Sequence, residues 1–247
     1  MKVLSLGWGI QSTTLAFMVA LGELPPVDVA IHADTGHESA LTYAFAERWT
    51  GWLQAHGVVV ATHEKKNIID KWGGMQLPAF TFGKKGNGQI RRQCTHEWKI
   101  RPMRQWLQAN REYQPVEQWI GISTDEALRM RPSGVKYITN RWPLIEKNMR
   151  RRDCQRWLIE HKLEVPSKSA CVFCPFHTTR EWRETRCIAK DWQQAVETDN
   201  LIRHARPPQD LYLHPSRKPL SEVDFRTEEE RGQMCMWDEE CTGICGV

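Results

Sequence analysis

Two groups of residues in this sequence have the types and spacing needed for chemistry. The first is the segment 5–14, which holds Gly7, Gly9 and the hydroxyl residues Ser12 and Thr13. Glycines let the backbone approach a phosphate, and the start of a helix offers unpaired N–H groups and a partial positive charge. A strand-to-helix turn whose hydroxyl caps the helix explains the same residues, so the segment alone leaves both interpretations open.

The second group is the pair Cys171 and Cys174, followed directly by Pro175. A Cys-x-x-Cys spacing occurs at zinc sites, at iron–sulfur sites and in redox pairs, and a proline after the second cysteine is common where iron–sulfur clusters bind. The region lacks the pattern of a thioredoxin-like redox domain. Two buried structural thiols are the alternative without a metal. A four-cysteine zinc site needs a second pair, for which Cys241 and Cys245 have a suitable spacing.

Length and composition set broad limits. The chain has 247 residues, with eight cysteines, twelve tryptophans and a net charge of +4. The length suits one α/β domain with additions, and the charge is too small to indicate a nucleic-acid-binding protein by itself. No apolar run approaches the length of a membrane span, and no secretory signal begins the chain. We therefore expect a cytoplasmic protein whose cysteines do not form a disulfide framework.

The elements that position these residues alternate between strand and helix. After a first strand at the N-terminus, the sequence predicts strands over 27–32, 58–61 and 117–122 and helices over 15–21, 39–56, 96–110 and 150–163. This order predicts an α/β fold with a doubly wound, Rossmann-like parallel sheet. The glycine-rich residues 67–93 predict a long loop. We expect a nucleotide-binding domain over 1–145 and a helical, cysteine-rich region over 146–247 packed on it.

Polar residues follow two of the predicted strands, at the edge where open α/β sheets bind ligands. The segment 34–38 follows the second strand, and Arg129 and Arg131 follow the fourth. Asp34 and Glu38 are candidates to meet a ribose or Mg²⁺, with plain turn residues as the alternative. The two arginines are candidate ligand contacts or surface salt-bridge partners. The run 150–152 predicts either a solvated helix start or a phosphate contact.

In this order, the motifs resemble the PP-loop ATP pyrophosphatase superfamily, also called the adenine nucleotide alpha-hydrolases. Within it they most resemble the phosphoadenosine phosphosulfate reductase-like branch. The resemblance covers residues 1–176 in ordered pieces, which include Cys94 with the basic residues and proline after it. The usual loop reads Ser-Gly-Gly-x-Asp-Ser, and here Gly7, Trp8 and Gln11 replace its first Ser, first Gly and Asp. Thr95 replaces the second cysteine of the branch's Cys-Cys pair.

The resemblance implies an adenine nucleotide alpha-hydrolase type fold with a cysteine-containing helical C-terminal extension. It implies that ATP or a sulfonucleotide binds with Mg²⁺ at Gly7, Gly9, Gln11, Ser12, Thr13, Asp34, Thr35, Gly36, Glu38, Gly121, Arg129 and Arg131. Cys94, Cys171 and Cys174 would be three ligands of a [4Fe–4S] cluster, with Zn²⁺ as the alternative metal. The implied catalytic residues are Ser12, Asp34, Cys241 and Cys245.

Three functions remain after this comparison of motifs. The first is an ATP-using enzyme of sulfur chemistry that adenylates an acceptor, a nucleobase or a nucleic acid, for sulfur transfer. The second is a reductase of phosphoadenosine phosphosulfate or adenylyl sulfate. The third is a non-catalytic nucleotide- or nucleic-acid-binding protein with structural zinc. Each needs an adenine nucleotide or nucleic-acid partner, and the enzymes also need a sulfur or electron donor. The sequence predicts no membrane partner and leaves open whether the chain forms a homodimer.

Overall fold

A five-stranded parallel sheet in the order β3-β2-β1-β6-β7 forms the centre of the protein. The computed structural model describes residues 1–64, 76–83, 86–227 and 229–231. The strands of this sheet are β1 (Lys2–Ser5), β2 (Val29–Asp34), β3 (Val60–Glu64), β6 (Val116–Ile120) and β7 (Ile138–Arg141). The order reverses direction between β1 and β6, and such a switch point is where open α/β sheets bind ligands. The predicted doubly wound parallel sheet is confirmed.

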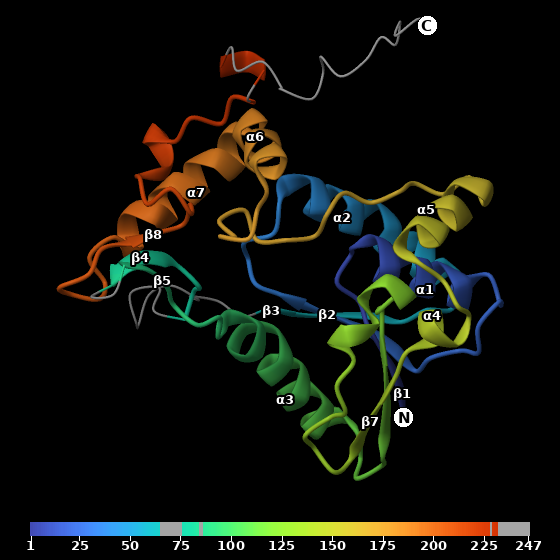
Figure 1. The fold of residues 1–247 in the computed structure, drawn as a ribbon. Helices are drawn as coiled ribbons and strands as arrows, with labels where there is room; N and C mark the ends of the chain where they lie inside the picture. The colour runs from blue at the N-terminus through green and yellow to red at the C-terminus, as the bar shows by residue number, and fades with distance from the viewer. Residues whose placement is uncertain (65–75, 84–85, 228, 232–247) are drawn as a thin grey trace, which may run out of the picture.

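Helices cover both faces of the sheet (Figure 1). On one face, α1 (Ile10–Ala20), α2 (Ala40–Ala55) and α5 (Arg151–Glu160) share a hydrophobic cluster with β1. On the other face, α3 (Arg101–Asn110) buries Leu107 against Val3 and Ile31. A short helix α4 (Pro143–Glu146) follows β7. Burial on both faces explains why the central strands read as nearly continuous apolar runs.

A second hydrophobic cluster lies beside the sheet. The antiparallel strands β4 (Phe80–Gly83), β5 (Gly86–Gln89) and β8 (Leu211–Tyr212) lie next to helix α7 (Ala189–Ile202), which follows α6 (Thr179–Cys187) (Figure 1). The buried aromatic residues of this second cluster are Trp98, Phe173, Trp182 and Phe225. The prediction of a long loop over 67–93 was wrong for β4 and β5: β5 pairs with β4, and β4 pairs with β8, a partner far along the chain that local periodicity cannot reveal. Residues 65–75 and 84–85 of that segment lie outside the described residues.

The predicted helices are present with shifted ends. Helix α2 begins after Ser39, whose hydroxyl accepts a hydrogen bond from the Leu41 N–H at 3.3 Å, as a helix cap should. The helix predicted over 96–110 consists of a π-helical segment, Thr95–Ile100, followed by α3 with Pro102 in its first turn. Turns of this kind are uncommon and frequently occur at functional sites. A 3₁₀ helix covers Thr124–Arg129 after β6, and shorter ones cover Leu220–Glu222 and Glu229–Arg231.

The boundary predicted after residue 145 stays a prediction. Helix α5 follows this boundary, yet its residues Cys154, Trp157 and Leu158 belong to the main cluster around α1. The C-terminal residues 232–247, with Cys241 and Cys245, lie outside the described residues. Among the helices that are described, none is both long and apolar enough to cross a membrane.

Asp191 links the C-terminal helices to the sheet domain. Its buried carboxylate accepts hydrogen bonds from the Ser39 hydroxyl at 2.7 Å and the Ala40 N–H at 3.1 Å, so α7 caps the start of α2. We expect Asp191→Ala to lower the free energy of unfolding by about 2 kcal/mol, because these donors lose their charged acceptor. Chemical denaturation measures this loss. The control is Glu197→Ala on the exposed side of α7, with an expected loss below about 0.5 kcal/mol. Equal losses would contradict the linking role.

Candidate functional site

The loop between β1 and α1 is closed by its own serine. The Ser12 hydroxyl accepts a hydrogen bond from the Gly7 N–H at 3.1 Å and donates one to the Gly9 carbonyl at 3.2 Å. Gly9 precedes the first turn of α1, and no side chain caps this helix end. An α-helix leaves its first N–H groups without partners inside the helix, and these groups attract anions. The loop therefore has the form of a phosphate site, and Ser12 braces it instead of capping the helix.

Trp8 supports the loop from the core. Its backbone has a φ of 55°, in the left-handed region that a bulky residue rarely adopts. Glycine adopts this region without steric cost, and the resembled loop has glycine at this place. The Trp8 indole is buried and packs edge-on against Phe45 and His32, with ring centroids 6.0 and 6.4 Å apart. We infer that this packing offsets the backbone strain and fixes the shape of the loop.

Gly121 brings the end of β6 against the start of α1. A Cβ atom at this position would lie 2.8 Å from the Ser12 backbone nitrogen and 3.0 Å from its Cα. Such contacts are too short for any side chain, so only glycine allows the two elements to approach this closely. The glycine loop and the segment after β6 consequently meet at the switch point of the sheet.

A polar network connects this junction with α5. The Gln11 side-chain amide donates to the Glu126 carboxylate at 3.0 Å, while its oxygen accepts from the Arg151 guanidinium at 2.8 Å. Arg129 forms an ion pair with the same Glu126. The Arg151 backbone N–H donates to the Asp125 carboxylate at 3.1 Å, and this bond helps to start α5 beside the loop. The network holds two guanidinium groups at the start of α1.

At the other end of the site, an ion pair joins the segment after Cys94 to the loop after β2, and a hydrogen bond adds the segment before Cys171. The Lys99 ammonium lies 2.8 Å from the Glu38 carboxylate, whose second oxygen accepts from the Ser169 hydroxyl at 3.0 Å. The Glu38 side chain is fully buried, whereas Lys99 is 37% exposed. Burial would lower the pKa of Lys99, but the Glu38 charge outweighs this effect and the pKa is raised. Glu38 also forms a backbone β-bridge with Cys171.

The three cysteines predicted as metal ligands line the same cavity. Cys94 precedes the π-helical segment, and Cys171 and Cys174 lie on the loop held by Glu38. Burial and the Glu38 charge raise the pKa of Cys171 to about 12, and burial also raises the pKa of Cys174. Neutral thiols are thus favoured while no metal is bound. Among the described residues, no group of three His, Cys, Asp or Glu side chains is gathered closely enough to hold a metal ion.

One cavity of about 530 Å³ contains both the glycine loop and the cysteines, a size typical of small-molecule sites. Its basic side chains are Arg92, Lys99, Arg129, Arg151 and Lys168, and Glu126 is the single carboxylate among its described lining residues. Trp98, Phe173 and Phe176 make the cysteine end apolar and aromatic. The cavity therefore suits an anionic ligand with an aromatic part. Of the predicted nucleotide-binding residues, it is lined by Gly7, Gly9, Gln11, Ser12, Gly121 and Arg129.

Other predicted residues lie elsewhere. Thr13 is completely buried, so its hydroxyl does not reach the cavity. The Asp34 carboxylate accepts from the Gly36 N–H at 2.8 Å and the Tyr43 hydroxyl at 2.7 Å, which fits the alternative of a turn residue. Thr35 is buried with its hydroxyl 3.5 Å from the Cys171 sulfur. The ligand roles predicted for these residues, and the catalytic role of Asp34, stay predictions.

Glu38 and Arg131 also differ from their expected surroundings, and two further cysteines lie outside the cavity. Glu38 is the buried partner of Lys99, so its carboxylate braces the cysteine loop and does not face the cavity. Arg131 is exposed and donates to the carbonyls of Leu128 and Met130. Cys154 is buried in the main core, and Cys187 is exposed at the end of α6. Neither lines the cavity.

The sequence prediction missed several residues of the cavity. Glu126, Lys168 and Ser169 line the cavity but are not among the residues that the sequence predicts for the site. The signal for Arg151 was the basic run 150–152, because positive side chains at a helix start oppose the helix dipole and need another reason to be there. Helical geometry separates the run, since Arg151 lines the cavity while Arg150 and Arg152 line a neighbouring surface pocket of about 430 Å³.

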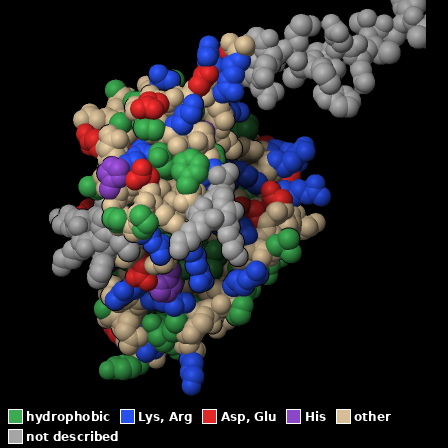
Figure 2. Space-filling model, turned by 60° about the vertical axis from the view of Figure 1, so that its left-hand side comes forward, with side chains coloured by type: hydrophobic (Ala, Val, Ile, Leu, Met, Phe, Trp, Pro, Cys, Tyr) green, Lys and Arg blue, Asp and Glu red, His purple; other side chains and the backbone are tan. Residues whose placement is uncertain are grey.

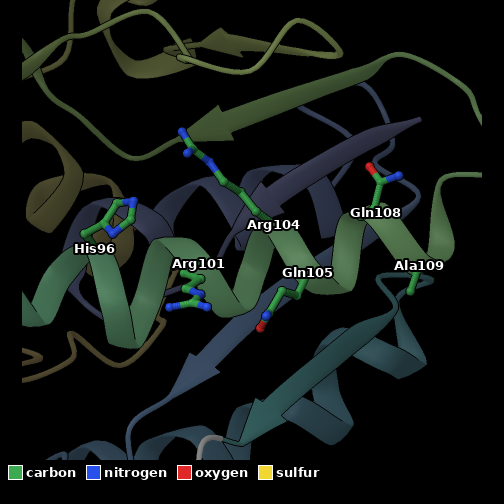
Figure 3. Close-up of a pocket in the computed structure, with 6 residues that line it drawn as sticks. All are labelled: His96, Arg101, Arg104, Gln105, Gln108 and Ala109. Carbon is green, nitrogen blue, oxygen red and sulfur yellow. The ribbon is translucent and has the colours of Figure 1, made fainter.

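A further surface pocket runs along α3 (Figure 3). It is lined by side chains from successive turns of a single helical stretch, His96, Arg101, Arg104, Gln105, Gln108 and Ala109. Neither the glycine loop nor a cysteine contributes to it. On the face drawn in Figure 2, basic and acidic side chains are interspersed. The cavity at the switch point is therefore the candidate site.

Comparisons with known proteins found a similarity in structure but no match in sequence. No family model matches the chain, and no curated protein matches it. The chain is similar in structure to a phosphoadenylyl-sulfate (PAPS) reductase. That crystal structure, from Candida auris and in complex with phosphate, has a TM-score of 0.45 and 14% sequence identity. The likeness covers 67% of this chain and 74% of that chain.

Loss of the Glu38 charge should loosen the cysteine end of the site. We expect Glu38→Gln to lower the free energy of unfolding by about 2 kcal/mol, less than for a fully buried pair because Lys99 keeps contact with solvent. We also expect faster alkylation of Cys171, measured by iodoacetamide labelling and mass spectrometry. The control is Glu184→Gln, which breaks an exposed pair with Arg180 and should cost below about 0.5 kcal/mol. Unchanged stability and labelling in Glu38→Gln would exclude the bracing role.

Proposed function

We propose that this chain is an ATP-binding PP-loop enzyme of sulfur chemistry, which adenylates an acceptor for sulfur transfer. The acceptor is a nucleobase or a nucleic acid. One observation carries the proposal: a single cavity is lined by the glycine loop at one end and by Cys94, Cys171 and Cys174 at the other. A phosphate site next to three thiols suits a reaction that first activates an oxygen and then replaces it by sulfur.

At the loop end, the first step is an adenylation. The acceptor oxygen attacks the α-phosphorus of ATP, the bond to the bridging oxygen of the β-phosphate breaks, and pyrophosphate leaves with its electron pair. The N–H groups of the loop, Ser12 and Arg129 are placed to hold the departing diphosphate, and Mg²⁺ would share its charge. A sulfur nucleophile then attacks the activated carbon and displaces AMP, so that a carbon–sulfur bond replaces the carbon–oxygen bond.

At the cysteine end, we propose three ligands of a [4Fe–4S] cluster. A cluster bound there through three thiolates would offer an open iron to an exogenous sulfide. Burial raises the pKa values of Cys171 and Cys174, and the nearby cations Lys99 and Arg92 respectively offset part of this rise. The three thiols must draw closer than the described arrangement to share one cluster.

The acceptor class rests on the surroundings of the cavity. Phe176 is 44% exposed and lies under the Arg92 guanidinium, 5.5 Å from the ring centroid, which suits stacking of a flat base. The neighbouring pocket, lined by Arg150, Arg152 and Arg156 beside Asp153, has a net positive charge that suits backbone phosphates. Both features favour a nucleobase within a nucleic acid over a small aliphatic acceptor.

Pyrophosphate release tests the proposed activity. Anaerobically purified protein with ATP, Mg²⁺ and total tRNA or free nucleosides should release pyrophosphate, and Ser12→Ala should reduce the rate about 10²-fold because the loop loses its brace. Ser133→Ala, in a surface loop that does not line the cavity, is the control. Absence of pyrophosphate with every acceptor would contradict the proposal. Release of sulfite from a sulfonucleotide with a reductant would favour the reductase instead.

Metal content tests the cysteine end. We expect a brown protein that contains iron and acid-labile sulfide, and we expect Cys171→Ala to lose both. The matched control is Cys187→Ala, since this exposed thiol does not line the cavity. A colourless protein with stoichiometric zinc would rule out the cluster and favour a structural zinc site.

A further inference from the structure

Gln11 lies between an acid and a base at the start of α1. Its amide nitrogen donates to Glu126 at 3.0 Å, and its amide oxygen accepts from Arg151 at 2.8 Å. The usual loop of the resembled superfamily has an aspartate at this place. A carboxylate here would face Glu126 and form an ion pair with Arg151. The neutral amide satisfies both neighbours without adding a charge.

The Arg151 side chain therefore keeps its positive charge available. Within the described part of the chain, no ion pair joins its guanidinium to a carboxylate, and the group lines the cavity beside the glycine loop. The two carboxylates near it have other partners: Glu126 pairs with Arg129, and Asp125 accepts the Arg151 backbone N–H and attracts the Arg151 charge without forming an ion pair with it. A guanidinium held by a neutral acceptor is oriented, yet its positive charge is not neutralised. The group can therefore still bind an anionic ligand.

We propose that Arg151, held in place by Gln11, binds the β- and γ-phosphates of ATP and the pyrophosphate derived from them. The inference rests on the proposed function, in which ATP is the nucleotide. Arg129, held by Glu126, lines the same cavity from the segment after β6, so the two guanidinium groups come from different elements. Gln11 is a positioning residue that acts through Arg151. Compared with the usual aspartate, Gln11 removes a negative charge from the loop. The Arg151 guanidinium then has no ion-pair partner among the described residues.

Calorimetric binding of ATP, inorganic pyrophosphate and AMP tests this assignment. We expect Arg151→Met to weaken ATP and pyrophosphate about tenfold, by loss of a charge-assisted bond, and to leave AMP unchanged because AMP lacks the outer phosphates. Arg151→Lys should weaken them less, since it keeps the charge and loses the fork geometry. The control Arg104→Met removes the same charge from α3, outside the cavity, and should change no affinity.

A double-mutant cycle tests the role of Gln11. We expect Gln11→Ala to weaken pyrophosphate about threefold in the native chain and to have no further effect in the Arg151→Met background. Additive losses would show that Gln11 does not act through Arg151. Equal losses for AMP, or native affinity in Arg151→Met, would overturn the assignment of Arg151.

The two proposals fail in different ways. If the native chain binds neither ATP nor pyrophosphate, the proposed function fails and this inference fails with it. If the native chain binds ATP and releases pyrophosphate while Arg151→Met behaves like the native chain, only the inference fails. Thermal unfolding of each variant separates loss of binding from loss of fold, and Arg151→Lys provides the second variant should Arg151→Met unfold.

Discussion

The contact between Lys99 and the buried carboxylate of Glu38 is the constraint on which the site depends. The two residues come from the segment after Cys94 and the loop after β2, and Ser169 adds the segment before Cys171. These three segments belong to distant parts of the chain, and they meet because a fully buried carboxylate requires charged and polar partners. The Cys171 loop is further tied to the loop after β2 through the hydrogen bond from the Val172 N–H to the His37 carbonyl at 2.9 Å. Without these contacts, the cysteines would have no fixed relation to the glycine loop.

The cavity is supported by two separate hydrophobic cores. The glycine loop, α1 and α5 belong to the core on one face of the parallel sheet, whereas the cysteine loop packs with Trp98 and Trp182 in the second core. A separate hydrophobic core thus supports each end of the cavity, and the polar contacts between the two ends fix their relative position. Basic side chains from both halves converge on the space between them, so the repulsion among these cations favours an anionic occupant.

Local sequence signals predicted the parts of this structure that depend on neighbouring residues. The strand–loop–helix start, the helix predicted to begin at residue 39 and the parallel sheet all follow from periodicity, glycine and hydroxyl positions, and they are present. Partners distant in sequence could not be predicted in the same way. The pairing of β4 with β8, the burial of Glu38 by Lys99 and the direction of Arg151 into the cavity depend on how elements pack. Thr13 illustrates the same limit, because a loop motif does not say which hydroxyl turns inward.

The left-handed Trp8 has a consequence for how this sequence can change. Its φ of 55° is tolerated together with an indole that packs against Phe45 of α2 and His32 of β2. A smaller side chain at position 45 would leave the strained backbone with less support, although that position does not line the cavity. A return to glycine at position 8 would relieve the strain but leave a hole the size of an indole in the core. A change at any one of positions 8, 32 and 45 therefore disturbs the packing of the other two, and we expect these positions to change together. The phosphate loop is coupled to helix α2 in this way.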